Sequence, residues 1–189
     1  MSKKQEIFEQ AAILFQEKGY GAASMRDLAE RVQLKASSLY SHIRRKEEIL
    51  EKICSDQALR FIEAMAVVEK LDASAAKKVE ALLALHIRTA LEDPTSITVF
   101  NDEWKHLEEP YLGEFLERRR EYEQRFREII RKGIEAGDFR PIDPNTAVNT
   151  LLTSIRWLHY RQYSRSPEET GKLEKEVIAL LMGGLKESF

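Results

Sequence analysis

The chain has little of several residue types that mark other classes of protein. Its 189 residues include one cysteine, Cys54, which excludes an internal disulfide framework and a thiolate metal cluster within one chain. The longest uncharged stretch worth testing, residues 144–155, is too short and too polar to cross a bilayer. The charged start, Met1–Glu6, runs directly into a helical pattern and does not resemble a secretory signal. We therefore expect a cytoplasmic protein without a membrane partner.

Motifs of common enzyme classes are also missing. The chain has no glycine-rich phosphate loop, no Gly-x-Ser-x-Gly elbow and no Cys/His dyad at a recognisable spacing. Glu103 and His106 form a Glu-x-x-His pair, the spacing used in di-iron helical bundles. Those sites need a second such pair and two further carboxylates, and no other histidine here follows a glutamate by three residues. The sequence therefore favours a protein that is not an enzyme and holds no metal or organic cofactor.

Helical periodicity, by contrast, extends over almost the whole chain. Hydrophobic residues make up 43% and charged residues 33% of the composition, which suits a protein built from amphipathic helices. No segment alternates for long enough to indicate a strand. The sequence predicts an all-α fold of about nine helices. Glycine and proline connectors place these helices at residues 3–18, 25–32, 36–42, 46–70, 74–91, 96–107, 111–136, 144–163 and 167–186.

The short helices at the N-terminal end predict a small domain, residues 1–50, followed by a helical bundle, residues 51–189. Lys and Arg exceed Asp and Glu by nine to seven in the first domain, and fall short by 21 to 25 in the second. This asymmetry permits nucleic-acid binding by the first domain but does not demonstrate it.

Residues 24–40 have the spacing of a helix-turn-helix. Leu28, Ala29 and Val32 are placed to pack the first helix, Leu34 to fill the turn and Leu39 to anchor the second helix. The small Ala29 suits two short helices that cross at a steep angle. This pattern leaves a polar set facing outward near the start of the second helix, where side chains can enter a major groove. The set comprises Lys35, Ser37, Ser38 and Ser41.

With its flanking segments, the motif resembles the N-terminal domain of the TetR family of bacterial transcription regulators. Family members end helix 1 in a Gly-aromatic turn, here Gly19-Tyr20-Gly21, and then have a Ser/Thr cap, here Ser24. A Leu-Tyr-x-His-Phe-x-x-Lys-Glu run follows the motif, here from Leu39 to Glu47 with Ile43 in place of Phe. Gln33 stands where the family usually has glycine, so we expect Gln33 to adopt a positive φ at some cost.

The resemblance implies a homodimeric regulator, usually a repressor, that binds palindromic operator DNA. Phosphate contacts carry over to Tyr40, His42 and Lys46, and to the start of the helix at Ser24 and Met25, where backbone N–H groups attract anions. The alternatives are a half-buried core aromatic for Tyr40 and a solvated helix start for Lys46. The full predicted DNA-binding set is Ser24, Met25, Lys35, Ser37, Ser38, Tyr40, Ser41, His42 and Lys46.

A single three-helix unit makes few phosphate contacts, so useful affinity requires two units about 34 Å apart on successive major grooves, and hence a dimer. In the family that the chain resembles, the last two helices of each subunit form an isologous interface. The apolar positions predicted for it are Leu151, Ile155, Leu158, Val177, Leu181 and Leu185. The alternative is that these side chains only close the core of one chain.

The helical remainder carries polar and aromatic residues on lines that otherwise face inward. Arg119 falls on the apolar line of the 111–136 helix, where a charge needs an internal carboxylate or an anionic ligand. Arg156 and Tyr160 share a second inward line of the 144–163 helix, beside Trp157. Each alone is more typical of core packing, but together they favour a pocket. The predicted effector-binding residues are Phe100, Asn101, Glu103, Trp104, Arg119, Tyr122, Arg156, Trp157 and Tyr160.

Several of these segments, together with Gly133 and Gly137-Asp138-Phe139, also resemble a TetR branch that senses acyl-coenzyme A thioesters. This second resemblance implies a small-molecule effector that relieves repression by binding one conformer of the dimer better than the other. The remaining alternative is a helical small-molecule-binding or interaction protein whose helix-turn-helix no longer binds DNA.

Overall fold

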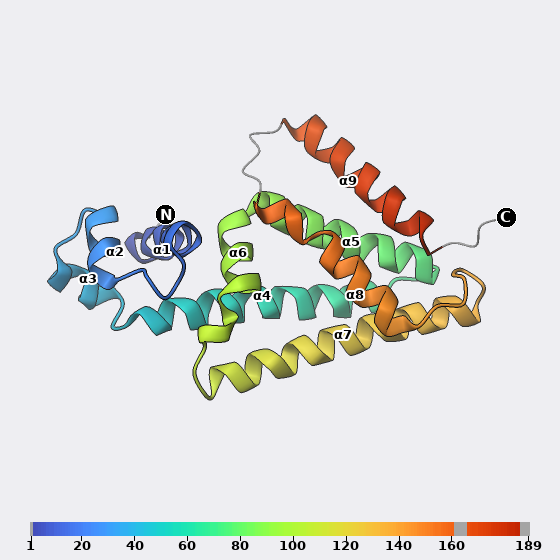
Figure 1. The fold of residues 1–189 in the computed structure, drawn as a ribbon, viewed down its shortest axis with the longest axis horizontal. Coiled ribbons are helices and arrows are strands. Elements are labelled where there is room, and N and C mark those ends of the chain that lie inside the picture. Colours follow the sequence, from blue (N-terminus) through green and yellow to red (C-terminus); the bar gives the residue numbers. More distant parts are fainter. Residues whose placement is uncertain (1, 161–165, 186–189) are drawn as a thin grey trace. The chain divides into compact units, whose positions relative to one another are not determined.

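The computed structural model describes residues 2–160 and 166–185. Within these ranges the chain contains nine α-helices, two short 3-10 segments and no strand, which confirms the all-α prediction (Figure 1). None of the described helices combines the length and the apolar character that a membrane span requires.

Most helices begin and end where the sequence predicts. The predicted bounds are confirmed to within one residue for α1 (Lys3–Lys18), α2 (Met25–Arg31), α3 (Ala36–His42), α4 (Lys46–Glu69), α5 (Ala75–Glu92) and α7 (Tyr111–Glu135). The last helix, α9, covers Pro167–Gly183. Its predicted end at residue 186 lies outside the described residues.

Two predicted helices are wrong in extent. α6 covers Pro94–Asp102, and the 3-10 segment η1 (Trp104–His106) follows it. α8 covers only Pro144–Ser154 and gives way to a second 3-10 segment, η2 (Arg156–Tyr160), so the predicted α-helix over 144–163 ends early. Residues 161–163 of that prediction lie outside the described residues. Thr153 and Ser154 at the break are weak helix formers whose hydroxyl groups compete for backbone hydrogen bonds.

Contacts divide the chain into two compact units. The first unit comprises residues 1–59 and 95–117, and the second comprises residues 60–94 and 118–189. The predicted division into residues 1–50 and 51–189 differs from these two units, and the assignment of DNA binding to residues 1–50 stays a prediction. Residues 95–117, distant in sequence, belong to the same compact unit as the predicted helix-turn-helix.

The core of the first unit joins the short helices to the 95–117 segment. Ile7 of α1, Leu28 of α2 and Leu39 of α3 are almost fully buried, and Val99 and Phe115 belong to the same hydrophobic cluster. A hydrogen bond from Gln16 Nε2 to Thr98 Oγ1, 3.0 Å long, adds a polar link between α1 and α6. The predicted DNA-binding helices thus share one core with α6 and the start of α7.

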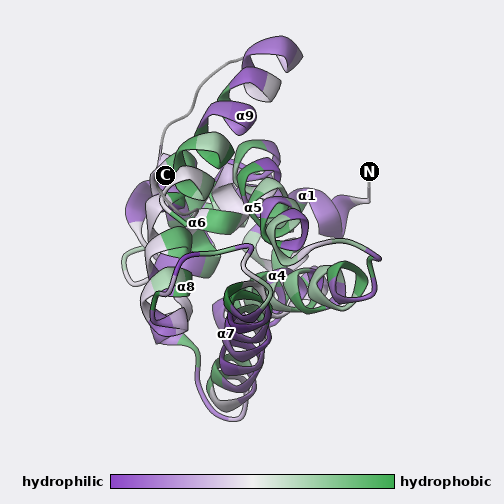
Figure 2. Ribbon diagram, turned by 90° about the vertical axis from the view of Figure 1, so that its right-hand side faces the viewer, coloured by the Kyte–Doolittle hydropathy of each residue, from purple (hydrophilic) through white to green (hydrophobic). Residues whose placement is uncertain are grey.

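The second unit packs α5 against α9 and η2, and Figure 1 shows α9 (red) running beside α5 (green). Leu82, Leu83 and Ile87 of α5 are fully buried. Gly133 of α7 lets the Phe139 ring approach closely, because an added Cβ there would lie 2.3 Å from Phe139 Cδ2. Most of α7 is hydrophilic in Figure 2, and its charges form ion pairs along the helix. These pairs include Arg119–Glu123, Arg125–Glu121 and Arg131–Glu135.

Candidate functional site

A reciprocal cap fixes the start of α2. Asp27 N donates to Ser24 Oγ (3.1 Å), and Ser24 N donates to Asp27 Oδ2 (2.9 Å). Lys18 Nζ donates to the same carboxylate (2.8 Å), and the Lys18 and Ser24 hydrogen bonds together lower the pKa of Asp27. The predicted capping role of Ser24 is confirmed. Since the Ser24 hydroxyl also donates to Asp27 Oδ2 (2.5 Å), it is already bonded within the chain, and its contact with a phosphate stays a prediction.

The turn between α2 and α3 has the backbone conformation that the sequence predicts. Gln33 has a φ of 55°, the one positive φ outside glycine in the part of the chain that the structure describes. Leu34 N donates to Ala29 O over 2.9 Å and closes the turn. A left-handed backbone costs a residue with a side chain about 1–2 kcal/mol. The turn is therefore held by the burial of Val32 and Leu39 and not by the preference of Gln33.

α3 presents a polar face to solvent. Leu39 is fully buried, whereas Tyr40 is 51% exposed, so about half of the Tyr40 surface is open to another molecule and its contact with a phosphate stays a prediction. Of the other predicted DNA contacts, Met25 packs partly against the core of the first unit and His42 is half-buried. The remaining members of the polar set are exposed, namely Lys35, Ser37, Ser38 and Ser41.

Lys46 has a structural role that the sequence does not reveal. Its Nζ donates to the backbone oxygens of Tyr20 (2.8 Å) and Ala23 (2.9 Å) and lies 4.2 Å from the centroid of the Tyr20 ring. Tyr20 is buried, and its hydroxyl donates to Glu47 Oε1 (3.2 Å). Burial and the Glu47 carboxylate raise the pKa of Tyr20. Lys46 thus ties the turn after α1 to the start of α4, which excludes the solvated alternative, and its contact with a phosphate stays a prediction.

Positive charge is concentrated around α3 more than the count over residues 1–50 indicates. From Val32 to Lys46 the chain has four cationic side chains, including Arg44 and Arg45, and no Asp or Glu. Arg45 is paired with Glu51 over 2.7 Å, whereas Arg44 is exposed. A patch of one charge attracts the DNA backbone from a distance. Arg44 is therefore a candidate phosphate contact that the residue-by-residue carry-over missed, although the charge run that marks it is visible in the sequence.

Four predicted effector residues belong to the first unit, and two of them meet a third aromatic ring. The Trp104 ring is stacked on Phe115, with centroids 5.7 Å apart and an interplanar angle of 15°. Phe100 packs edge-on against the same ring at 5.4 Å. Glu103 Oε2 lies 3.4 Å from His106 Nε2, while Asn101 is half-buried.

In the second unit, Tyr122 forms a polar and aromatic cluster that the sequence did not predict. Its hydroxyl lies 2.7 Å from His86 Nε2, and the His86 ring stacks on Phe61 with centroids 4.3 Å apart. Burial lowers the pKa of His86 to about 4 and raises that of Tyr122, so both groups are neutral near pH 7. His86 carries no motif in the sequence that would have singled it out.

The predicted inward direction of Arg119 is wrong. Its side chain is 49% exposed, and its Nε donates to Glu123 Oε1 over 3.1 Å. Phe115, Tyr122 and Phe126 define the buried face of α7. Arg119 lies at the edge of that face, where a long side chain carries its charge out to solvent.

The predicted second inward line of α8 is also wrong. Arg156 is exposed, and Trp157 and Tyr160 are 40% and 60% exposed. These residues lie on η2, and a 3-10 segment turns through three residues instead of 3.6, so the α-helical alignment is lost. Binding of an effector by these three residues stays a prediction, but the inward-facing line on which we based it is absent.

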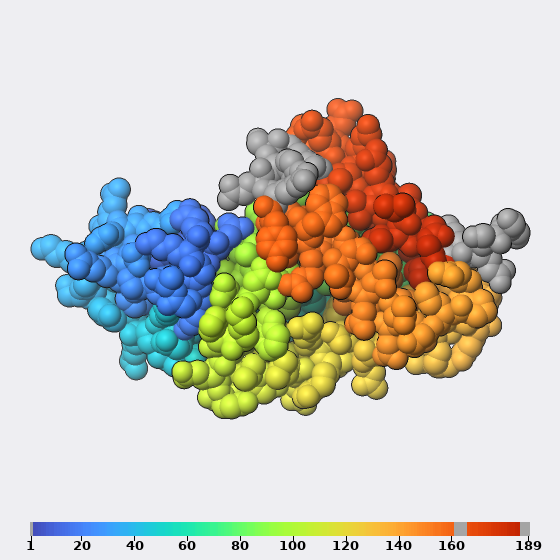
Figure 3. Space-filling model, in the orientation of Figure 1, coloured from blue at the N-terminus to red at the C-terminus, as the bar shows by residue number. Residues whose placement is uncertain are grey.

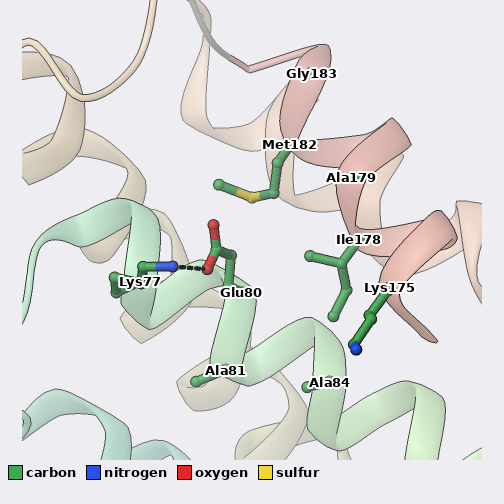
Figure 4. A pocket seen from close by; sticks show the side chains of 9 residues that line it. All are labelled: Lys77, Glu80, Ala81, Ala84, Lys175, Ile178, Ala179, Met182 and Gly183. Carbon is green, nitrogen blue, oxygen red and sulfur yellow. Dashed lines mark hydrogen bonds and ion pairs between the residues drawn. The ribbon is translucent and has the colours of Figure 1, made fainter. Parts of the chain in front are cut away.

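Within the described part of the second unit, α5 and α9 enclose a groove of about 580 Å³. Ile178 and Met182 extend from α9 toward α5, and Lys77 on the opposite wall donates to Glu80 over 2.6 Å (Figure 4). The lining residues are Lys77, Glu80, Ala81, Ala84, Lys175, Ile178, Ala179, Met182 and Gly183. The predicted effector residues are not among them.

Four of the six side chains predicted for the dimer interface are buried inside the chain. Their exposed fractions are 3%, 5%, 1% and 3% for Leu151, Ile155, Leu158 and Leu185. The prediction that they face a second copy is wrong, because they fill the interior of their own unit. Val177 and Leu181 are partly exposed. Leu180 is 78% exposed on α9, whose surface (red) is visible in Figure 3.

Comparisons with known families match the chain over most of its length. Residues 7–53 match the family described as bacterial regulatory proteins, tetR family. Residues 72–182 match the family described as tetracyclin repressor-like, C-terminal domain.

Curated relatives have similar lengths and are named as repressors. The chain is 23% identical to the HTH-type transcriptional repressor KstR2 of Mycolicibacterium smegmatis, with 99% of this chain and 92% of that protein covered. It is 28% identical to the repressor of the same name from Rhodococcus jostii, with 97% and 91% covered.

Solved structures share the fold at low sequence identity. The ketosteroid transcriptional regulator KstR2 of Mycobacterium tuberculosis superposes with a TM-score of 0.91 at 20% identity, with 99% of this chain and 96% of that chain covered. AibR in complex with isovaleryl coenzyme A and operator DNA gives a TM-score of 0.81 at 21% identity, with both chains fully covered.

Proposed function

The chain belongs to the TetR family of bacterial regulators, and from this membership we propose that it represses transcription by binding palindromic operator DNA as a homodimer. Members of this family are DNA-binding regulators and not enzymes. The observation that carries the proposal is the α2–turn–α3 element, which combines a buried apolar side with an exposed polar and cationic one.

The exposed face of α3 supports DNA binding in two ways. Lys35, Ser37 and Ser38 lie exposed at the first turns of α3, where a recognition helix contacts base edges. Tyr40 and Arg44 lie farther along and extend a hydroxyl and a charge suited to phosphates. Serine hydroxyls accept from or donate to either type of base pair, so specificity depends on the whole surface. Such a regulator acts in the cytoplasm, where the operator is found.

The dimer that we propose keeps Val177 and Leu181 of the predicted interface and omits the four predicted residues that are buried. Leu180 is 78% exposed, and Val177 and Leu181 flank it on α9. Trp157 and Tyr160 add exposed aromatic area on η2. Large apolar side chains exposed together are typical of a surface that another molecule covers. A second copy is the partner that operator binding requires, since one helix-turn-helix makes too few contacts.

We propose an acyl-coenzyme A thioester as the effector. The resemblance to an acyl-CoA-sensing branch supports this class, and AibR, which shares the fold, is described in complex with isovaleryl coenzyme A. Within the first unit, the aromatic group around Phe115 offers an apolar wall, which is typical of a small-molecule site. An effector of this kind releases the operator only by binding the DNA-free conformer more tightly.

Footprinting on the DNA upstream of the protein's own gene tests the proposal. We expect protection of a palindrome by the purified dimer, and loss of protection on adding one member of an acyl-CoA panel. Protection that no thioester relieves would retain the repressor and discard the effector class. Absence of specific binding on that DNA and on genomic fragments would favour a helical binding protein with a degenerate helix-turn-helix.

A further inference from the structure

Two buried amide oxygens among the described residues of the first unit, Gln16 Oε1 and Gln57 Oε1, accept no hydrogen bond, and Gln57 is the more deeply buried residue. Gln57 lies on α4 and is 8% exposed, yet its Oε1 accepts no hydrogen bond from any described residue. Burying an amide oxygen without a donor is unfavourable, because the oxygen gives up its hydrogen bonds to water. Native proteins keep few such atoms, and those that remain often meet a ligand or an ordered water.

Gln57 lies on the face of α4 that contributes to the hydrophobic core of the first unit. Ile53, Cys54 and Ala58 share the buried face of α4 with it. These three side chains belong to the same hydrophobic cluster as Phe115. The predicted effector residues Phe100 and Trp104 pack against that cluster. The unsatisfied amide thus lies on a helix face whose core also includes aromatic side chains.

The charge nearby limits what the amide can bind. Burial, with a contribution from the Glu103 carboxylate, raises the pKa of the Cys54 thiol to about 12. The negative charge of Glu103 therefore acts on Cys54, which lies on α4 about one turn before Gln57. Its side chain is only 16% exposed, so its field is weakly screened. A phosphate or carboxylate is disfavoured here, whereas a neutral donor is not.

We propose that Gln57 is an effector-binding residue whose amide oxygen accepts a hydrogen bond from a neutral group, an amide N–H or a hydroxyl, on a largely apolar effector. The inference rests on the proposed function, since it assumes a small-molecule effector. For an acyl-CoA thioester the matching donor is an amide N–H of the pantetheine arm, and the phosphates lie away from Glu103.

Replacing the amide separates this role from a structural one. Gln57→Met removes the unsatisfied oxygen and nearly preserves the volume. We expect the free variant to melt at a higher temperature than wild type, and its affinity for the thioester that releases the wild-type protein to fall at least tenfold. Its operator affinity without effector should be unchanged. Gln124→Met, on the exposed side of α7, is the matched control and should change none of these quantities.

Isothermal titration with straight-chain, branched and ring-bearing acyl-CoA thioesters, together with thermal melting, measures both effects. Unchanged thioester affinity in Gln57→Met would overturn the proposal, whatever the melting temperature does. If Gln57→Met folded poorly, Gln57→Leu would provide the same comparison. A wild-type protein that binds operator but no thioester would refute the effector class itself. If one thioester released the operator equally well from the wild-type protein and from Gln57→Met, only the role of Gln57 would be refuted.

Discussion

The α2–α3 region and the α8–α9 region are both helical, but different interactions determine them. In the first region a capping box, a left-handed turn residue and a buried Leu39 act within a few residues of one another. In the second region, Leu158 is buried while Leu180 is exposed, although both are leucines in apolar patterns. The pattern of apolar residues therefore indicates a helix without indicating which neighbour covers it.

The two regions also differ in whether their polar side chains are exposed to solvent or buried. The recognition surface leaves its polar side chains exposed, where they can bind a charged partner. The second unit buries His86 and Tyr122 as a neutral pair. Substitutions in each region test whether its polar and apolar side chains have these different roles.

The largest effect is expected at the exposed apolar surface of α9. Leu180→Glu places a charge on the proposed dimer surface, so we expect the dimer to dissociate and operator affinity to fall at least 100-fold, about 2.7 kcal/mol. Light scattering should then give the chain mass of 21.9 kDa in place of twice that value. Leu180→Met, which stays apolar, is the control. A stable Leu180→Glu dimer with normal operator affinity would place the interface elsewhere.

The next effect concerns the pH dependence of stability in the second unit. Because the pKa of His86 is lowered to about 4 from a usual value of 6.5, the unfolded chain takes up a proton first as pH falls. The contribution of His86 to stability is therefore present above pH 6.5 and is lost between pH 6.5 and about 4. Its full size is on the order of 3 kcal/mol.

His86→Gln removes this titration and can still hydrogen-bond Tyr122. Urea unfolding of both proteins at pH 7 and pH 4.5 measures the difference, and we expect the variant to lose less stability than wild type. Carboxylates titrate in both proteins and cancel in the comparison. Parallel losses would show that His86 is solvated in the native state.

A smaller effect on stability distinguishes Lys46 from Tyr40 in the first unit. Lys46→Met removes two hydrogen bonds to backbone oxygens and the contact with the Tyr20 ring, and should lower the free energy of unfolding by about 2 kcal/mol. Tyr40→Ala removes an exposed side chain and should change stability by less than about 0.5 kcal/mol. Its operator affinity should nevertheless fall about tenfold. Equal loss of stability in both variants would make Tyr40 a structural residue.

The smallest effect is expected in the turn. Gln33→Gly relieves the left-handed conformation, and the greater freedom of glycine in the unfolded chain offsets part of the gain. A net stabilisation of about 0.5–1 kcal/mol should appear in urea unfolding, with operator affinity unchanged. Destabilisation would mean that the Gln33 side chain contributes contacts that outweigh its backbone strain.

The sequence predicts local features well because their causes are local. The Ser24 cap and the positive φ of Gln33 depend on residues within a single turn, and both are confirmed. The end of α8 at Ser154 was missed, because apolar spacing continues through residues 155–158 although the backbone changes to a 3-10 segment. Burial of one polar residue depends on packing across the unit, so neither Gln57 nor His86 could be identified from the sequence.

The central claim, that the α3 surface binds operator DNA through its cations and polar groups, is tested most directly by the salt dependence of operator affinity. Each protein–phosphate contact contributes about 0.9 to the slope of log affinity against log salt. We predict a steep negative slope for the wild-type dimer, and a slope shallower by about two for Arg44→Ala, which removes one contact per subunit. An affinity independent of salt, or a slope that Arg44→Ala leaves at the wild-type value, would contradict this assignment.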